Sequence, residues 1–335
     1  MRFPVPAGTA PALRAGVSVA VPQLLVLAAD RPHWSMFAAF GAFTSLYGRN
    51  RVGLSRLVMQ LSAGAALVVA VLLGVLTGLS GDRAWIAVGV AAVVAGLGNA
   101  VASAADWHPP GPLFLVFAFG AVASVPQEPA NLLTALAVTA ASAAFSILIG
   151  SLLRDRSGPA AGPKGLPVDW RTSAFCALAA LTAGATATAA GIGHPYWATV
   201  AAVAPLSARG FTARLVRAGH RIGGTLLGLV LAAALLALHL DPYPAVLALA
   251  VLQVAAELTV GRHYGVAMLF ITPLALVMNQ VAAPRPIGGL LWDRGLETVI
   301  GGLVACLIVL GVRWLAAGPP VERTGHEPEG SADRV

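Results

Sequence analysis

Charged residues are scarce in this 335-residue chain, at 10% of the sequence, whereas hydrophobic residues make up 58%. Soluble domains carry about 25% charged residues. A water-soluble fold of this composition would lack the polar side chains to cover its surface. A bilayer core about 30 Å thick needs roughly 20 apolar residues per crossing helix, and apolar stretches follow one another from Ala12 to Leu315. The composition predicts an all-α bundle of transmembrane helices.

Cysteine is also scarce, and the two present, Cys176 and Cys306, stand alone in apolar stretches. They match no metal-ligand spacing and give no support for a disulfide, so we interpret both as small buried or lipid-facing residues. The sequence lacks a phosphate-binding loop, a nucleophile–base pattern and a histidine–cysteine cluster. We therefore expect no enzyme activity, no cofactor and no metal.

Acidic residues are outnumbered, and the formal net charge is +7. Such an excess is found in nucleic-acid-binding proteins. Here, however, the basic residues gather in the breaks between apolar stretches, as the positive-inside rule expects of cytoplasmic loops. We expect a lipid bilayer as a partner and no nucleic acid.

Twelve transmembrane helices are predicted, six in each half of the chain. They cover residues 12–29, 33–47, 58–79, 84–104, 112–125, 130–153, 172–192, 195–208, 218–240, 243–260, 264–283 and 288–315. Residues 33–47 and 195–208 are short for a full crossing, and a count of ten follows if they are broken or re-entrant. The first stretch has no clear cleavage motif, so we expect a retained helix rather than a signal peptide.

Four segments follow from this division. Residues 1–153 form a first transmembrane repeat, 154–171 a cytoplasmic linker rich in Gly, Pro and charge, 172–317 a second repeat, and 318–335 a disordered cytoplasmic tail. With the N-terminus inside, most arginines fall in cytoplasmic loops. Only Arg31, Arg83, Arg285 and Arg294 remain outside. This asymmetry predicts a plasma-membrane protein with both termini in the cytoplasm.

The two halves of the chain echo each other. Pro32-His33-Trp34 opens the second predicted helix, and His194-Pro195-Tyr196-Trp197 opens the eighth. Leu115-Val116-Phe117 resembles Met268-Leu269-Phe270 in the corresponding helix of the second half. Because six helices per half return the chain to the same side, we predict parallel repeats about an axis along the membrane normal, as in several transporters.

Several motifs of the second half resemble a known family. Tyr196-Trp197-Ala198 is followed by a basic loop and by Arg221-Ile222-Gly223-Gly224-Thr225, and Arg294-Gly295-Leu296-Glu297-Thr298 comes later. This order is similar to the fusaric acid resistance (FUSC-like) and aromatic acid exporter families. The resemblance implies an inner-membrane transporter of small, weakly acidic, often aromatic molecules, with such a molecule as its partner. Thr272, in Phe270-Ile271-Thr272-Pro273-Leu274, is a further candidate from the same resemblance.

Ionisable residues inside the membrane are costly and point to function. Arg294 and Glu297 stand three residues apart, on one helix face where they can pair. We predict either that Arg294 binds a substrate carboxylate while Glu297 serves as counter-ion or proton carrier, or that they form a structural pair near the interface. Glu257 is either a proton carrier or, as we favour, an interfacial residue near Arg262.

Other residues are candidates for binding or packing. Arg221 follows Arg214 and Arg217 on one helix face, which either lies on anionic lipid or lines an electropositive vestibule. Trp197 is an interface anchor or a stacking platform for an aromatic substrate. The remaining candidates concern helix packing and helix breaks, and they are Gly224, Gly228, Gly301, Gly302, Pro205 and Pro273.

The functional prediction is a secondary transporter that exports small organic or aromatic acids, driven by protons. Two alternatives stay open: a passive, channel-like permease of the same architecture, and a non-transporting membrane scaffold or accessory subunit. The substrate, the coupling ion and a homo-oligomeric state are open as well.

Overall fold

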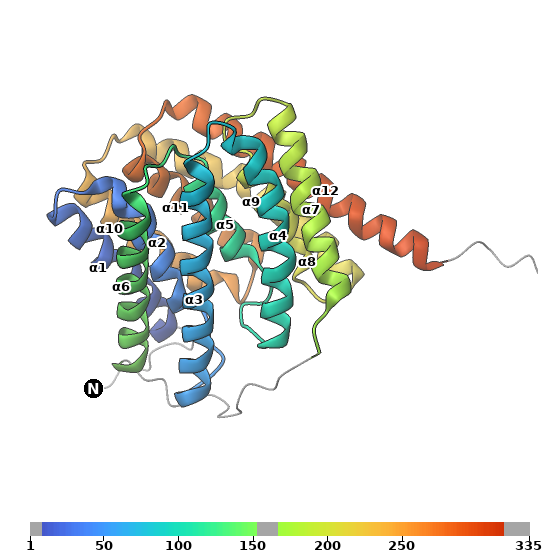
Figure 1. The fold of residues 1–335 in the computed structure, drawn as a ribbon, viewed down its shortest axis with the longest axis horizontal. Helices are drawn as coiled ribbons and strands as arrows, with labels where there is room; N and C mark the ends of the chain where they lie inside the picture. The colour runs from blue at the N-terminus through green and yellow to red at the C-terminus, as the bar shows by residue number, and fades with distance from the viewer. Residues whose placement is uncertain (1–8, 153–166, 318–335) are drawn as a thin grey trace, which may run out of the picture.

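A computed structural model describes residues 9–152 and 167–317 of the chain. Throughout these residues the structure is helical and contains no strand, as predicted (Figure 1). Most of the predicted linker and the whole predicted tail, 318–335, lie outside the described residues.

Twelve α-helices follow one another along the described chain. The first six are α1 (Thr9–Ala28), α2 (Ser35–Ala42), α3 (Gly53–Gly78), α4 (Arg83–Ala104), α5 (Leu113–Ala123) and α6 (Asn131–Leu152). The second six are α7 (Trp170–Ala189), α8 (Tyr196–Leu206), α9 (Phe211–Ala237), α10 (Pro242–Val260), α11 (Tyr264–Ala282) and α12 (Ile287–Ala317). Short 3₁₀ helices, η1 (Pro32–Trp34) and η2 (Phe43–Leu46), flank α2.

Nine of the described helices are long and apolar enough to cross a bilayer, fewer than the twelve or ten predicted crossings. The other three are α2, α5 and α8, and at 1.5 Å per residue they are too short for a core of about 30 Å. Every residue of α2 and α8 is buried. The three short helices therefore lie inside the bundle, where neighbouring helices rather than lipid surround the non-helical flanks.

The loops gather on two opposite faces of the bundle (Figure 1). On the Arg49 face, which carries residues 47–52, 105–112, 207–210 and 261–263, the Gly48 N–H donates to the His108 carbonyl at 2.9 Å. The His194 face carries residues 29–31, 79–82, 124–130, 190–195, 238–241 and 283–286, and there the Gln127 N–H donates to the Gly78 carbonyl at 3.1 Å.

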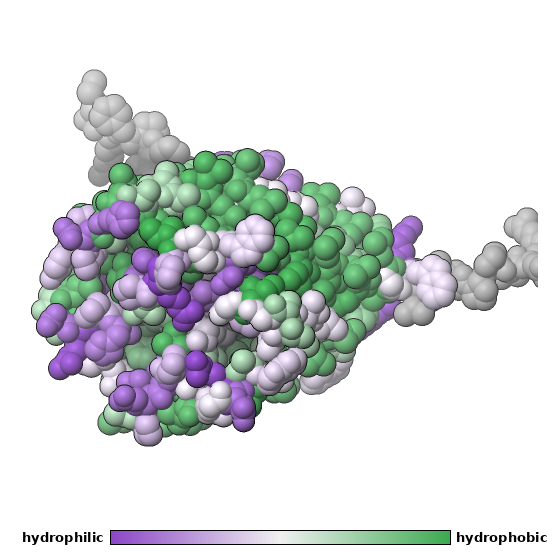
Figure 2. All heavy atoms as spheres, turned by 90° about the horizontal axis from the view of Figure 1, so that it is seen from above, coloured by the Kyte–Doolittle hydropathy of each residue, from purple (hydrophilic) through white to green (hydrophobic). Residues whose placement is uncertain are grey.

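Figure 2 looks onto the His194 face, where hydrophilic residues gather around a hollow and hydrophobic residues cover the flanks. Large apolar side chains such as Leu133, Val230 and Leu307 are exposed on the outer helices. This arrangement matches a protein whose flanks contact lipid and whose two ends contact water. The chain is a multi-pass membrane protein.

Helices of the first half pack against helices of the second half. Helix α1 packs on α10, and α4 packs on α7. Glycine makes the first contact close, because a Cβ at Gly16 of α1 would lie 2.6 Å from Val254 Cγ2 of α10. At Gly96 of α4 it would lie 3.2 Å from Ala177 Cβ of α7. The two halves are thus interlocked rather than separate bodies.

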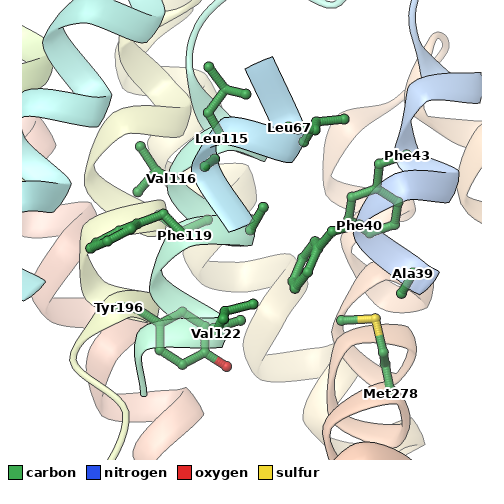
Figure 3. Close-up of a cluster of buried hydrophobic side chains, with 14 of the residues drawn as sticks. Ala39, Phe40, Phe43, Leu67, Leu115, Val116, Phe119, Val122, Tyr196 and Met278 are labelled. Carbon is green, nitrogen blue, oxygen red and sulfur yellow. The ribbon is translucent and has the colours of Figure 1, made fainter. Parts of the chain in front are cut away.

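The core between the halves is rich in aromatic side chains. Figure 3 shows Phe40 and Phe43 near α5, with Tyr196 and Met278 closing the cluster from the second half. The ring of Phe40 meets that of Phe117 edge-on at 5.2 Å between centroids, and Phe117 stacks on Tyr196 at 6.2 Å. Such geometries add roughly 0.5–1.5 kcal/mol per pair beyond area burial, so the core joins α2, α5 and α8 firmly.

Candidate functional site

A cavity of about 120 Å³ lies between the two halves of the bundle. Its lining runs from Arg49 and Pro109, near the Arg49 face, to Met278 and Arg294 in the parts of α11 and α12 nearer the His194 face. An apolar cavity of about 150 Å³ is large enough to hold benzene. The space therefore suits a molecule built around one aromatic ring, and we call it the central cavity.

Four arginines and a single acidic residue line the central cavity. The arginines are Arg49, Arg217, Arg221 and Arg294, and the acidic residue is Glu257. Guanidinium groups cannot be deprotonated under ordinary conditions and bind carboxylates through two parallel hydrogen bonds. The cavity therefore carries an excess of positive charge in a low-dielectric setting, which attracts an organic anion.

Aromatic rings from the first half form the opposite wall of the central cavity. Phe43 follows α2, and Phe114 and Phe117 stand one turn apart on α5. Phe43 and Phe114 meet edge-on at 5.3 Å between centroids, which fixes both rings without a polar partner. This wall offers apolar contact and ring stacking to the body of a molecule whose charged end meets the arginines.

Tyr264, at the start of α11, holds two of the arginines. Arg221 Nη1 donates to the Tyr264 hydroxyl at 3.0 Å, and the Arg217 guanidinium carbon lies 4.3 Å from the centroid of the same ring. Both arginines lie on α9, whose Gly224 and Gly228 pack against α11: a Cβ on Gly224 would lie 2.5 Å from the Gly265 carbonyl oxygen. The close α9–α11 contact therefore brings the arginines to Tyr264.

Arg294 lies in α12 with only 3% of its surface exposed. Its guanidinium carbon stands 4.1 Å from the centroid of the Trp197 ring of α8, and its Nε has no hydrogen-bond partner among the described residues. Gly301 allows this stacking, because any Cβ there would collide with the Ala198 carbonyl oxygen of α8. Gly302, beside it, faces Ile222 of α9 in the same way.

Arg294 and Glu297 form no ion pair within the described residues, so the predicted pairing is wrong. Instead, Glu297 Oε1 accepts a hydrogen bond from the His194 backbone N–H at 3.0 Å. Its other oxygen, Oε2, is buried without a partner, and the residue does not line the central cavity. Glu297 therefore anchors the chain that enters α8, at the N-terminal end where a carboxylate is electrostatically favoured.

Glu257 contacts a different arginine from the one we predicted. Its Oε2 lies 3.3 Å from Arg49 Nη1 of the first half, and Arg49 Nε in turn donates to His108 Nε2 at 3.5 Å. Arg262, the predicted neighbour, donates to its own helix at the Leu258 carbonyl, 2.7 Å away. The Glu257–Arg49 pair links the two halves at the end of the central cavity nearest the Arg49 face.

Residues 178–308 match the model of the fusaric acid resistance protein-like family. The resemblance predicted from the sequence is thereby confirmed for the part of the chain from α7 to α12. No curated protein and no solved structure matches the chain. Together with the nine candidate spans, the match indicates a membrane transporter with a small-molecule substrate.

The fusaric acid resistance protein-like region supplies only part of the central cavity. Arg217, Arg221, Glu257, Tyr264 and Arg294 lie within it. The aromatic wall and Arg49 come from the first half, outside the matched residues. The site is therefore completed by chain that the family model does not cover.

Two further predicted candidates of this region lie away from the central cavity. Thr272 is fully buried and faces Gly228, where a Cβ would lie 2.8 Å from the Thr272 Cβ. Trp197 is 1% exposed and does not line the cavity itself, but its ring lies against the Arg294 guanidinium group. Pro205 falls one residue before the end of α8, and α11 continues through Pro273 as a helix.

Several residues of the site were missed by sequence reasoning. Arg49, Tyr264, Phe114 and Phe117 all line the central cavity, but none was a candidate, and Phe117 was noted only in the comparison of the two halves. The one available signal was the spacing of Phe114 and Phe117, three residues apart on one helix face. Arg214, grouped with Arg217 and Arg221 in the sequence, instead donates to Thr172 Oγ1 at 3.3 Å, away from the central cavity.

Proposed function

We propose that this protein is a proton-coupled exporter of small organic acids that carry an aromatic ring. The observation that carries the proposal is the central cavity, whose four arginines face one carboxylate and a wall of phenylalanines. Its volume of about 120 Å³ limits the bound molecule to roughly a single ring with short substituents. The fusaric acid resistance protein-like match of residues 178–308 supports the same class of substrate.

We assign different roles in substrate binding to the arginines of the central cavity. Arg294 stacks on Trp197 and, unlike Arg221, donates to no tyrosine hydroxyl among the described residues, so we assign to it the substrate carboxylate. Arg217 and Arg221 are held by Tyr264 and supply a fixed positive field. The rings of Phe114 and Phe117 receive the aromatic body.

Glu257 provides a means of coupling to protons. It competes with the anionic substrate for Arg49, because both are carboxylates and Arg49 lines the same cavity. On its way to Arg294, an entering substrate anion contacts Arg49 first, and Glu257 then loses its cationic partner and accepts a proton, since an unpaired carboxylate in a buried setting favours its neutral form. Substrate entry and proton uptake are thus positively linked, so that one proton accompanies each anion.

The Arg49 face is proposed to be cytoplasmic, and with it both termini. The described arginines in its loops or in the helix turns beside them include Arg14, Arg49, Arg51, Arg56, Arg171, Arg209, Arg214, Arg217, Arg262 and Arg313, whereas those of the His194 face are Arg31, Arg83 and Arg285. Cytoplasmic loops are enriched in arginine and lysine. The membrane is then the plasma membrane, and export runs from the Arg49 face to the His194 face.

The two-repeat organisation is also a proposal, and the helix packing supports it. Helix α3 packs on α5 and α6, as α9 packs on α11 and α12. Helix α2 packs on α6 as α8 packs on α12, and α1 packs on α10 as α7 packs on α4. Each of these contacts has a counterpart when both helix numbers are advanced by six, with α1 following α12 in the count, which is the pattern of a two-fold repeat.

A flux assay in proteoliposomes tests the transport proposal. We expect benzoate, a one-ring carboxylate, to be transported faster when a pH gradient is imposed. Arg294→Gln and Arg221→Gln should each reduce that flux at least tenfold, the effect of losing about 1.4 kcal/mol of binding. Arg209→Gln, which removes the same charge from an exposed position on the same face, is the matched control and should retain flux.

The outcomes separate the alternatives. Flux that does not respond to the pH gradient would identify a passive permease. Absence of benzoate flux in a correctly folded protein, together with co-purifying membrane partners, would identify a scaffold and reject the transporter. Equal flux in Arg294→Gln and in Arg209→Gln would remove Arg294 from the binding site.

A further inference from the structure

His194 lies at the centre of a network on the His194 face, beside the ends of α11 and α12, the helices that carry Met278 and Arg294 of the central cavity. Its Nδ1 lies 3.0 Å from Asp293 Oδ2 of α12, and its Nε2 lies 2.8 Å from Arg285 Nη1 of the α11–α12 loop. The backbone N–H of His194 donates to Glu297. One residue therefore ties the entrance of α8 to α12 and to the loop before it.

The chemistry of the partners fixes the form of the imidazole. Arginine has N–H donors and no acceptor, so His194 Nε2 must carry a lone pair to accept from Arg285. The proton of the neutral ring then resides on Nδ1 and is donated to Asp293. Only the neutral imidazole makes both contacts.

Protonation of Nε2 breaks one contact and keeps the other. The added proton occupies the lone pair that Arg285 requires, and it places a second positive charge 2.8 Å from the guanidinium group. The imidazolium keeps its bond to Asp293, now as an ion pair. Arg285 is therefore released from His194, while α8 stays tied to α12.

The side chains around His194 contain the charges needed for such a response. Asp293 and Glu297 face it from α12, and Arg285 faces it from the α11–α12 loop. Tyr196 and Trp197 of α8 flank the ring, with centroids 6.3 and 5.9 Å away, and Arg294 lies beyond Trp197. Burial holds the pKa of His194 below its usual value; the hydrogen bond with Asp293 opposes this, and the charge of Arg285 adds to it.

We propose that His194 is the proton-responsive residue of a gate on the His194 face, and that its protonation releases Arg285 and opens the central cavity to that side. This inference rests on the proposed function, because it assigns the face to which the cavity releases its anion. Arg285 is fastened to α11 as well, through its backbone N–H, which donates to Gln280 Oε1 at 3.2 Å, and its carbonyl, which accepts from Gln280 Nε2 at 3.0 Å. Its release therefore frees the outer end of α11, where Met278 lines the cavity.

Cysteine accessibility tests the gate without relying on transport. Met278→Cys is placed in a background in which Cys176 and Cys306 are replaced by alanine. A membrane-impermeant thiol reagent is then applied from the His194 face at pH 5 to 8. Met278 is 4% exposed, so its labelling requires opening. Leu240→Cys, at an exposed position on the same face, corrects for the lower thiolate content at low pH.

We expect corrected labelling of Met278→Cys to rise as the pH falls, by at most about tenfold per pH unit, because a single proton is involved. His194→Gln keeps an amide donor and acceptor but cannot be protonated, so its labelling should be slow and independent of pH. His239→Gln makes the same change at an exposed histidine of this face and should behave as the parent. Arg285→Met removes the hydrogen bond to His194, so Met278→Cys in this background should be labelled at every pH.

The gate would be overturned if labelling of the parent did not vary with pH. It would also be overturned if labelling of His194→Gln still depended on pH. If His194→Gln does not fold, the Arg285→Met result decides: slow labelling at high pH would reject the role of the contact. Benzoate flux in the same proteoliposomes separates the two proposals. If labelling depends on pH but benzoate is not transported, the exporter is rejected and the gate is kept. If benzoate is transported but labelling does not depend on pH, the gate is rejected and the exporter is kept.

Discussion

The contact between α8 and α12 supports the most demanding structural prediction, the effect of Gly301→Ala. The added methyl group would collide with the Ala198 carbonyl oxygen and lie 2.6 Å from Ala201 Cβ and 2.9 Å from the Ala202 nitrogen. These atoms belong to the backbone or its first side-chain carbon, so no rotamer change can relieve the overlap. The two helices must separate, and we expect a cost of about 1–3 kcal/mol, the range for overpacked cores.

Gly311 of the same helix supplies a matched control. Nothing lies within 4 Å of a Cβ at this exposed position, so Gly311→Ala should stabilise the helix by roughly 0.5–1 kcal/mol through the lower backbone entropy of alanine. The two variants make the same chemical change in α12 and should differ in unfolding free energy by at least about 1.5 kcal/mol.

The assay is reversible denaturation in detergent, with the free energy of unfolding measured for both variants and the parent. The separation should also move Trp197 from beneath Arg294, so Gly301→Ala should weaken benzoate binding while Gly311→Ala leaves it unchanged. Equal stability of the two variants would show that α8 and α12 are not in this close contact, and the geometry argued for Arg294 would fall with it.

Three further predictions concern other parts of the chain. Asp169→Ala should cost about 1 kcal/mol of stability, because the carboxylate accepts the N–H of the third residue on, at 2.9 Å, and caps α7; Asp82→Ala, at an N-cap without such a bond, should cost less in the same denaturation assay. Burial, and then the charge of Arg49, lower the pKa of His108 below 6.5; the unfolded chain then binds more protons, so stability should fall as pH drops through about 6.5, and a pH series should show a smaller fall in His108→Gln. Phe117→Leu should slow benzoate flux but spare that of an aliphatic acid such as butyrate, and equal slowing of both would argue against ring stacking.

The positions of the helices could be predicted from the sequence, because apolar stretches alternate with turn-forming residues. The predicted 264–283 corresponds to Tyr264–Ala282, and the predicted 84–104 to Arg83–Ala104. The burial of α2 and α8 could not be predicted. In a bilayer, both the lipid-facing and the protein-facing sides of a helix are apolar, so the sequence has no period that separates them.

The site was predictable where it contains charge. Arg294, Arg221 and Glu257 stand out in an apolar sequence, and all three line the central cavity. Their partners could not be predicted. A pair three residues apart on one helix gains only about 0.2–0.5 kcal/mol, and for Arg294 the Trp197 ring, brought in by the fold, takes the place of Glu297.

The packing of α1 on α10 and of α4 on α7, each between the two halves, bears on how the protein is synthesised. A ribosome delivers α1 long before α10 exists, yet Gly16 of α1 is shaped for close contact with Val254 of α10. Until the second half arrives, the face of α1 marked by Gly16 has no α10 to cover it. The newly made first half must therefore leave this face to lipid or to an insertion chaperone, and the two halves, if synthesised as separate chains, should accumulate only when they are made together.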